Sequence, residues 1–327
     1  MTLHERIFIA FLSSLRLIKI AVLTLLLGSA STCFALDGLT IVLSEEGGAY
    51  SEFAVNLSNI LTQSNTNRLS IKIVTVDKFS SEEIPRTSNG QLLVAVGSSA
   101  MSAMAQKPLP VPILNVLVPQ SSYVKTIKQN PRLQDSRRFS AVFVDQSWVR
   151  QFGLIQVSMT GHPRVGVLIG KDATDLIPTL QSAAKEAEVS LNIETVSEDA
   201  ELLAALRKLL ANSDAMLAIP DPRIYNRNNI SSILLTSYRQ QIPLFGFSAS
   251  YVKAGALAAV YSQPYQISQQ VAEIINSLPS NALLPSPQYP RYFSVNINPQ
   301  VARSLSINIA SEVELQNKLK HLTERAQ

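Results

Sequence analysis

The stretch LLVAVGSSAMSAMA, residues 92–105, contains the unit from which the fold is built. Its first five residues are a short apolar run, which is typical of a buried strand. Gly97-Ser98-Ser99 follows this run at the point where a helix is expected to begin. The stretch therefore predicts a strand that leads into a helix, and an α/β fold repeats this step.

The same alternation of apolar runs and helix-period segments continues on both sides of this stretch. Besides Leu92–Val96, we expect strands at Leu39–Leu43, Leu69–Val76 and Ile113–Val118. Between the first and second of these three, the apolar residues that share one helical face are Phe53, Ala54, Leu57, Ile60 and Leu61. The pattern predicts βαβ units around a mostly parallel sheet, which would form one lobe.

A polar stretch from Lys125 to Arg138 interrupts the pattern, and we interpret it as a solvated loop or helix face. The alternation then restarts, with strands expected at Arg164–Ile169, Leu191–Val196, Ala215–Ile219 and Leu244–Phe247. The predicted fold class is therefore α/β, with two doubly wound, Rossmann-like lobes that each hold a parallel sheet. Because ligands bind beyond the carboxyl ends of parallel strands, two facing sheets would share one cleft.

The last third of the chain departs from this regular alternation. We expect a strand at Ala256–Tyr261 and then an amphipathic helix through Leu278. Four prolines within Pro279–Pro290 predict a surface excursion with little regular structure. A last strand is expected at Phe293–Ile297, and Ser311–Gln327 has the pattern of a polar amphipathic helix.

Residues 1–35 have the pattern of a cleaved export signal. The basic residues at its start are Arg6, Arg16 and Lys19. An apolar run at 20–27 and small residues before Ala35 complete the pattern. The two later charges leave fewer uninterrupted apolar residues than the roughly 20 that span a bilayer. We expect a periplasmic protein; a retained anchor helix and a lipid attached at Cys33 remain as alternatives.

Charge gives little support for a nucleic-acid partner. Cleavage after Ala35 would remove three of 28 basic residues and one of 24 acidic residues, so the net charge would fall from +4 to +2. No Lys/Arg-rich run remains, and we expect no nucleic-acid binding. Cleavage would also remove the single cysteine, so the fold would need no disulfide.

Signals of catalysis are weak in this sequence. His162 and His321 are the histidines that remain after residue 35, and neither Gly-x-Ser-x-Gly nor Gly-x-Gly-x-x-Gly occurs. No cluster of His, Cys and carboxylate residues has the spacing of a metal site. We therefore expect a protein that is not an enzyme and that needs no cofactor or metal.

The ends of the predicted strands supply the candidate ligand-binding residues. These are Tyr50, Ser98, Ser99, Asp221, Ser248 and Tyr251. Tyr50 would offer a stacking face beside paired glycines, and the two serines could hold a carboxylate or phosphate at a helix start. Asp221 could receive a ligand amine. The alternatives are an ordinary turn at Tyr50 and helix capping by the serines and Asp221.

Four further features of the sequence are segments that follow one another along the chain: the opening stretch, PRVGVLIG at 163–170, QIPLFGFSASYVKAGALAAVYS at 241–262 and FSVNINPQVARSLSINI at 293–309. Together they resemble the ABC transporter substrate-binding protein family that includes proposed tryptophan- and tyrosine-type binders. Val260-Tyr261-Ser262 stands where the family usually has Tyr-Gly, and Ser306 replaces the usual glycine of the closing element. The resemblance therefore does not identify the ligand of this protein.

The resemblance implies a type I periplasmic-binding-protein architecture, in which several crossovers join lobes that close on a ligand. The implied division is a signal peptide at 1–35, a first lobe of 36–142 plus 255–285, and a second lobe of 143–254 plus 286–327 that includes the hinge return. The implied function is the periplasmic solute-binding component of an ABC-type uptake system.

Such a protein would be a monomer that binds a small polar or amino-acid-like molecule and delivers it to a permease. Two alternatives stay open at this point. One is a ligand-sensing adaptor for a membrane signalling receptor, because the same fold hosts different functions. The other is an enzyme that would use Glu45, Glu46 and Asp221.

Overall fold

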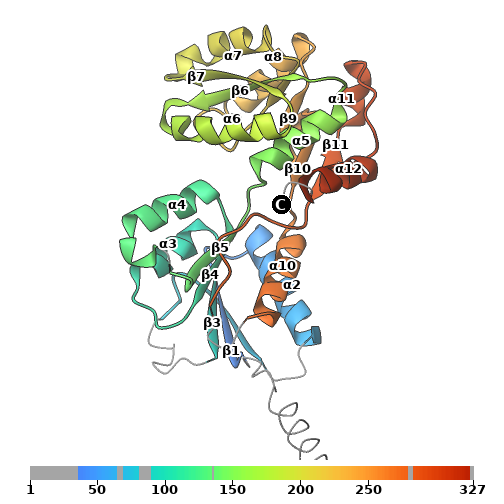
Figure 1. Cartoon of the computed structure of the whole chain (residues 1–327). Helices are drawn as coiled ribbons and strands as arrows, with labels where there is room; N and C mark the ends of the chain where they lie inside the picture. The colour runs from blue at the N-terminus through green and yellow to red at the C-terminus, as the bar shows by residue number, and fades with distance from the viewer. Residues whose placement is uncertain (1–35, 65–68, 81–89, 135, 279–282, 325–327) are drawn as a thin grey trace, which may run out of the picture.

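Two β-sheets, each covered by helices, form two lobes of the chain (Figure 1). The computed structural model describes residues 36–64, 69–80, 90–134, 136–278 and 283–324. The first sheet has the strand order β2-β1-β3-β4-β5 and the second has the order β11-β10-β9-β8-β6-β7. The predicted α/β class with two doubly wound lobes is confirmed. The predicted export signal and Cys33 lie outside the described residues.

The first sheet is entirely parallel. Its strands are β1 (Gly38–Leu43), β2 (Ser70–Thr75), β3 (Gln91–Val96), β4 (Ile113–Val118) and β5 (Phe139–Phe143). Alternate residues of β3 point to opposite faces, as the pleat requires. Leu92, Val94 and Val96 pack with α2 (Gly48–Ser64) and α10 (Pro264–Asn276). Leu93 and Ala95 pack on the other face, toward α3 (Ser98–Gln106) and α4 (Gln120–Gln129).

The second sheet is parallel except at one edge. Its strands are β6 (Arg164–Gly170), β7 (Ser190–Val196), β8 (Ala215–Leu217), β9 (Leu244–Gly246), β10 (Ala258–Tyr261) and β11 (Ser294–Ile297), with β11 antiparallel to β10. Its helices are α5 (Trp148–Ser158), α6 (Ile177–Glu186), α7 (Leu202–Leu210), α8 (Ile230–Arg239), α9 (Ala249–Ala254), α11 (Pro299–Ser304) and α12 (Glu312–Glu324). The predicted C-terminal helix packs through Leu315 and Leu319, which are fully buried.

The chain returns to the first lobe later than predicted. Gly255 was the expected point of return, but β10 belongs to the second sheet, where Ala258 lies beside Phe245 of β9. The reason is that β10 follows α9 directly as one more βα step of the same lobe. The crossing comes after Tyr261, and α10 then places Ile267 and Val271 in the core of the first lobe.

The proline-rich segment is more ordered than the sequence predicted. In its described part, residues 283–290, Leu284 is fully buried and Gln288 forms a bridge with Val142 of β5. The Phe143 N–H donates to Gln288 O at 3.0 Å, and the Gln288 N–H donates to Ala141 O at 2.9 Å. The segment thus satisfies the backbone groups on the open side of the edge strand β5, which would otherwise need water or another chain.

The polar stretch 125–138 forms the end of α4, a 3₁₀ turn at Pro131–Leu133 and the approach to β5. This confirms the prediction of a solvated loop or helix face, because all five basic residues of the stretch are exposed: Lys125, Lys128, Arg132, Arg137 and Arg138. Strand β5 and helix α5 were not predicted. Among the described residues, no helix is both long and apolar enough to cross a lipid bilayer.

Candidate ligand-binding cleft

Each sheet contains one point where the strand order reverses, and parallel α/β sheets bind ligands at the carboxyl side of such a point. In the first lobe the reversal lies between β1 and β3, so the loops that follow Leu43 and Val96 are neighbours. In the second lobe it lies between β6 and β8, so the loops after Gly170 and Leu217 are neighbours.

The reversal point of the first lobe is organised by Ser44. Its hydroxyl donates to Val96 O at 2.8 Å and accepts the Ala100 N–H at 3.0 Å. Ser44 therefore accepts a hydrogen bond from one of the free N–H groups at the start of α3. The N-cap residue of this helix, Gly97, has no side chain that could accept it. Gly97 between them has φ 87°, and a Cβ there would lie 2.6 Å from Ser44 Oγ and 2.7 Å from Tyr50 Cζ. The Tyr50 ring thus packs directly on the glycine turn.

The three predicted residues of the first lobe stand around this turn. Tyr50 is half-buried at the start of α2, and burial, followed by the charge of Glu45, raises the pKa of its hydroxyl. Ser98 is half-buried and Ser99 is exposed. The structure brings Tyr50 and Ser98 together around Gly97. The capping role that the sequence offered for the two serines is taken by Ser44.

Asp221 has a structural role at the reversal point of the second lobe. It is 7% exposed, its Oδ2 accepts the Gly170 N–H at 2.8 Å and its Oδ1 accepts the Arg223 N–H at 3.0 Å. These bonds join the end of β6 to the turn after β8. Arg223 in turn forms an ion pair with Asp172 at 2.7 Å. Both carboxyl oxygens of Asp221 are therefore already engaged by backbone groups.

Tyr251 belongs to an aromatic cluster of the second lobe. Its ring lies 4.4 Å from that of Phe247 and 6.5 Å from that of Tyr225, measured between centroids. The Tyr251 hydroxyl donates to Tyr225 O at 3.4 Å, and burial raises its pKa to about 12. Ser248 is the N-cap residue of α9, with no hydrogen bond from its side chain to the helix. The cluster brings Tyr251 close to the Asp221 turn, through Tyr225.

An open pocket lies between the two lobes, and the 390 Å³ of space that it encloses includes open solvent. The first lobe contributes Gln120 and Ser121, and the second lobe contributes Leu176, Ile219 and Pro220. The segments that join the lobes contribute Asp145, Gln146 and Tyr289, and Trp148 is the first residue of α5 in the second lobe. The pocket therefore lies where the carboxyl ends of both sheets meet, as the two-lobed prediction requires.

Asp145 is the charged group of this pocket. Its Oδ2 accepts the Gln120 N–H at 2.5 Å, and among the described residues no Lys, Arg or His forms an ion pair with it. Burial raises the pKa of the Asp145 carboxyl, and the bond from Gln120 acts in the opposite direction. The Tyr289 hydroxyl donates to Gln120 Oε1 at 2.7 Å, so the Gln120 residue connects the acid and the aromatic ring.

In the described part of the chain, three short crossovers join the lobes, at residues 144–147, 262–263 and 289–293. Side chains connect each of them to the others. Gln146 in the first donates to Ser262 Oγ in the second at 2.8 Å, and Ser262 donates to Tyr292 O in the third at 2.5 Å. Arg150 is 6% exposed and donates to Gln146 Oε1 at 2.6 Å and to Pro290 O at 2.7 Å. Burial lowers the pKa of Arg150 to about 10. The hinge is therefore one hydrogen-bonded unit.

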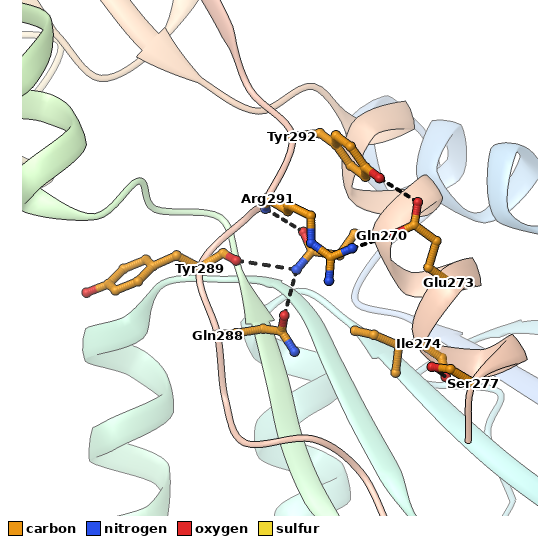
Figure 2. Close-up of polar contacts among 8 residues, drawn as sticks. All are labelled: Gln270, Glu273, Ile274, Ser277, Gln288, Tyr289, Arg291 and Tyr292. Carbon is orange, nitrogen blue, oxygen red and sulfur yellow. Dashed lines mark hydrogen bonds and ion pairs between the residues drawn. The ribbon is translucent and has the colours of Figure 1, made fainter. Parts of the chain in front are cut away.

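Gln270 of α10 holds the third crossover in place (Figure 2). This fully buried amide donates to Gln288 Oε1 at 2.9 Å and to Tyr289 O at 3.4 Å, and it accepts the Arg291 N–H at 2.7 Å. Glu273, one turn further on, accepts from the Tyr292 hydroxyl and the Arg291 guanidinium. With its backbone fixed in this way, Tyr289 directs its ring away from α10, as Figure 2 shows.

Comparison with known proteins agrees with this geometry. The model of the ABC transporter substrate-binding protein family matches residues 140–318, which is more than half of the chain. The chain belongs to this family. Members bind small-molecule ligands, work with an ABC permease, are typically non-enzymatic and are generally extracellular or periplasmic. No curated protein matches the sequence significantly.

Solved structures share the fold of this substrate-binding protein. A ligand-free, open substrate-binding protein with adhesive properties from Clostridium difficile has a TM-score of 0.66 at 13% identity, over 84% of this chain and 96% of that one. An ABC domain from Streptococcus pneumonia in complex with L-Trp has a TM-score of 0.54 at 12% identity, over 87% and 98%. A conserved domain protein from Vibrio cholerae has 0.54 at 19% identity, over 86% and 98%.

The pocket of this substrate-binding protein is lined by residues that the sequence did not single out. None of the six predicted residues is among its nine lining residues, although Asp221 directly follows Pro220. Two signals could have found some of the others. Trp148 is the single tryptophan of the chain, and Gln120 follows the predicted strand β4, so the strand-end rule that selected Ser98 also applies to it. Asp145 follows β5, which was not predicted.

The residues of the enzyme alternative do not form one cluster of free acids. Glu45 and Glu46 are exposed at the start of the β1–α2 loop, and Glu46 pairs with Lys78 at 3.1 Å. Asp221, in the other lobe, is hydrogen-bonded by backbone groups. Within the described part of the chain, no group of three or more His, Cys, Asp or Glu residues is arranged to hold a metal ion.

Proposed function

We propose that this family member is the solute-binding component of an ABC-type uptake system, and that it binds a small polar or amino-acid-like ligand between its lobes. The observation that carries the proposal is the interlobe pocket, because both lobes and two of the three crossovers contribute to its lining. A ligand in that position would gain contacts from both sides when the lobes rotate about the hinge.

The chemistry of the lining supports a ligand of this kind. Trp148, Leu176 and Ile219 offer apolar surface, while Gln120 and Asp145 offer hydrogen-bonding groups. Small-molecule sites combine a mostly apolar wall with a few polar groups in this way, since apolar burial supplies affinity and polar groups supply orientation.

The proposal extends to properties inferred from the sequence. Tyr50, Ser98, Ser99, Asp221, Ser248 and Tyr251 are proposed contacts or supports at the rim of the cleft. We further propose that residues 1–35 act as a cleaved export signal, that the mature protein is a periplasmic monomer that delivers its ligand to a permease, and that it neither binds nucleic acid nor catalyses a reaction.

The test is calorimetric titration of the purified protein with a panel of amino acids, amines, carboxylates and sugars, together with small-angle X-ray scattering. We expect saturable 1:1 binding by part of the panel, with a smaller radius of gyration in the bound state. Replacing Trp148 by Ala should weaken that binding at least tenfold, since the variant removes a wall of the pocket.

Tyr238→Ala is the matched control, because Tyr238 is an exposed aromatic residue of α8 in the second lobe. This variant should bind like the wild type. Absence of binding across the whole panel, with an unchanged radius of gyration, would overturn the proposed function.

A further inference from the structure

We propose that the interlobe pocket selects an organic cation: an ammonium group attached to a compact apolar or aromatic body, without a carboxylate. The inference rests on the proposed function and narrows its ligand class. It follows from the charge of the pocket lining, from the engagement of two nearby arginines and from the aromatic side chains beside Asp145.

The pocket lining carries one acid and no base. Asp145 is the only charged side chain among its nine lining residues. The Asp145 carboxylate is half-buried. Among the described residues, the group of another residue that donates to it is the backbone N–H of Gln120. Desolvating a carboxylate without a cation is costly, and a positively charged ligand is the partner that would recover this cost.

Two arginines near the pocket are engaged elsewhere. Arg223, at the reversal point of the second lobe, is paired with the Asp172 carboxylate at 2.7 Å. Arg150, behind the pocket in the hinge, donates to two oxygens and lies 4.4 Å from the Phe293 ring. A ligand carboxylate would therefore face Asp145 without a guanidinium to neutralise it, and like charges in a partly desolvated site repel strongly.

Aromatic and apolar groups complete the site. Trp148 and Tyr289 lie with Asp145 in the same lining, and aromatic faces attract ammonium ions. The Tyr289 ring has a fixed position, because Gln120 Oε1 accepts from its hydroxyl and Gln270 holds its backbone. Leu176, Ile219 and Pro220 of the second lobe would cover the apolar body of the ligand. A sugar would find few hydrogen-bonding groups on that wall.

A matched series of ligands tests the charge preference. Phenethylamine, L-phenylalaninamide, L-phenylalanine and 3-phenylpropionate share one aromatic ring and differ in their ammonium and carboxylate groups. We expect phenethylamine and the amide to bind at least tenfold more tightly than L-phenylalanine, and 3-phenylpropionate to show no binding. Each tenfold step corresponds to about 1.4 kcal/mol.

The Asp145→Asn variant tests the residue. Its affinity for amines should be at least tenfold lower than that of the wild type. The difference in affinity between phenethylamine and L-phenylalanine should also be smaller. The Asp199→Asn variant is the control, because Asp199 is an exposed acid of the second lobe in a 3₁₀ turn. It should behave like the wild type, and circular dichroism should show that both variants are folded.

The outcomes separate this inference from the proposed function. Preference for L-phenylalanine or 3-phenylpropionate, or an Asp145→Asn variant with wild-type amine affinity, would overturn the cation inference while a binding cleft still stands. Binding and compaction that occur only with sugars or carboxylates in the wider panel would also overturn the cation inference and leave the binding cleft standing. Absence of any ligand and of any compaction would overturn both.

Discussion

The ligand-binding role proposed for Asp145 comes at a cost in folding stability. Burial raises the pKa of its carboxyl, so the ionised form is held less favourably in the folded protein than in the unfolded chain. Asp145→Asn should therefore increase the free energy of unfolding at pH 7 by about 1 kcal/mol, measured by urea denaturation. Asn Oδ1 can still accept the Gln120 N–H, so the hydrogen bond survives the change.

The sign of the pH dependence follows from the same shift. An acid with a raised pKa in the folded state stabilises the fold when it is protonated, and that contribution is lost as the pH rises through the folded-state pKa. The stability advantage of Asp145→Asn should therefore shrink as the pH falls toward the unfolded-state value. A variant less stable than the wild type at pH 7 would show that the ionised carboxylate, with its Gln120 bond, stabilises the fold.

Ser44 and the serines of the opening stretch show the limit of sequence reasoning at the residue scale. The strand-end rule correctly placed Ser98 and Ser99 at the start of a helix, but the group that caps this helix comes from Ser44, with a hydrogen bond to Ala100. The two residues are 56 positions apart in the sequence. Their meeting depends on β1 and β3 being neighbours, and local periodicity does not specify strand order.

At the scale of elements, α10 controls the path of the third crossover through one buried amide. Replacing Gln270 by Leu would leave the Arg291 N–H and the Gln288 amide without their present partner. We expect a loss of about 2 kcal/mol in the free energy of unfolding, because each buried polar group left unpaired costs about 1 kcal/mol or more. Ligand affinity should also fall, since Tyr289 would lose its fixed position.

Gln181→Leu on α6 provides the comparison, because Gln181 is exposed and its side chain forms no hydrogen bond with the described residues. This variant should change stability by less than about 0.5 kcal/mol. Equal stability of the two variants in urea would contradict the anchoring role of Gln270.

Most elements that repeat the βα step were predictable, and so were the last strand and the C-terminal helix, whereas β5 and α5, where the chain first leaves one lobe for the other, were missed. Strand β5 escaped prediction because Phe139–Phe143 is short, buried on both faces and directly preceded by the polar stretch. Strand β10 was recognised, but its apolar residues 258–260 fit either core equally well. Pairing with β9 decided the lobe, and this depends on the chain path rather than on local composition.

At the scale of the whole molecule, the two lobes follow from the sequence because each is built from local βα steps. The position of the pocket does not, since it depends on where three crossovers meet. Gln146, Ser262 and Pro290 come from three distant parts of the chain, and Gln146 connects to Ser262 directly and to Pro290 through Arg150. The residues that line the pocket are brought together by the hinge, and no single segment of the sequence encodes that arrangement.

This architecture predicts rigid-body closure when ligand binds. The lobes have separate hydrophobic cores and are joined by three short segments, so the hinge is the part that can absorb rotation. Lys125→Cys on α4 and Thr179→Cys on α6 place two fluorophores on exposed residues of different lobes, with Cys33 replaced by Ser. Transfer efficiency between them should rise on addition of a binding ligand. A pair within the second lobe, Thr179→Cys with Arg207→Cys, should report no change, and an equal change in both pairs would show that the lobes deform rather than rotate.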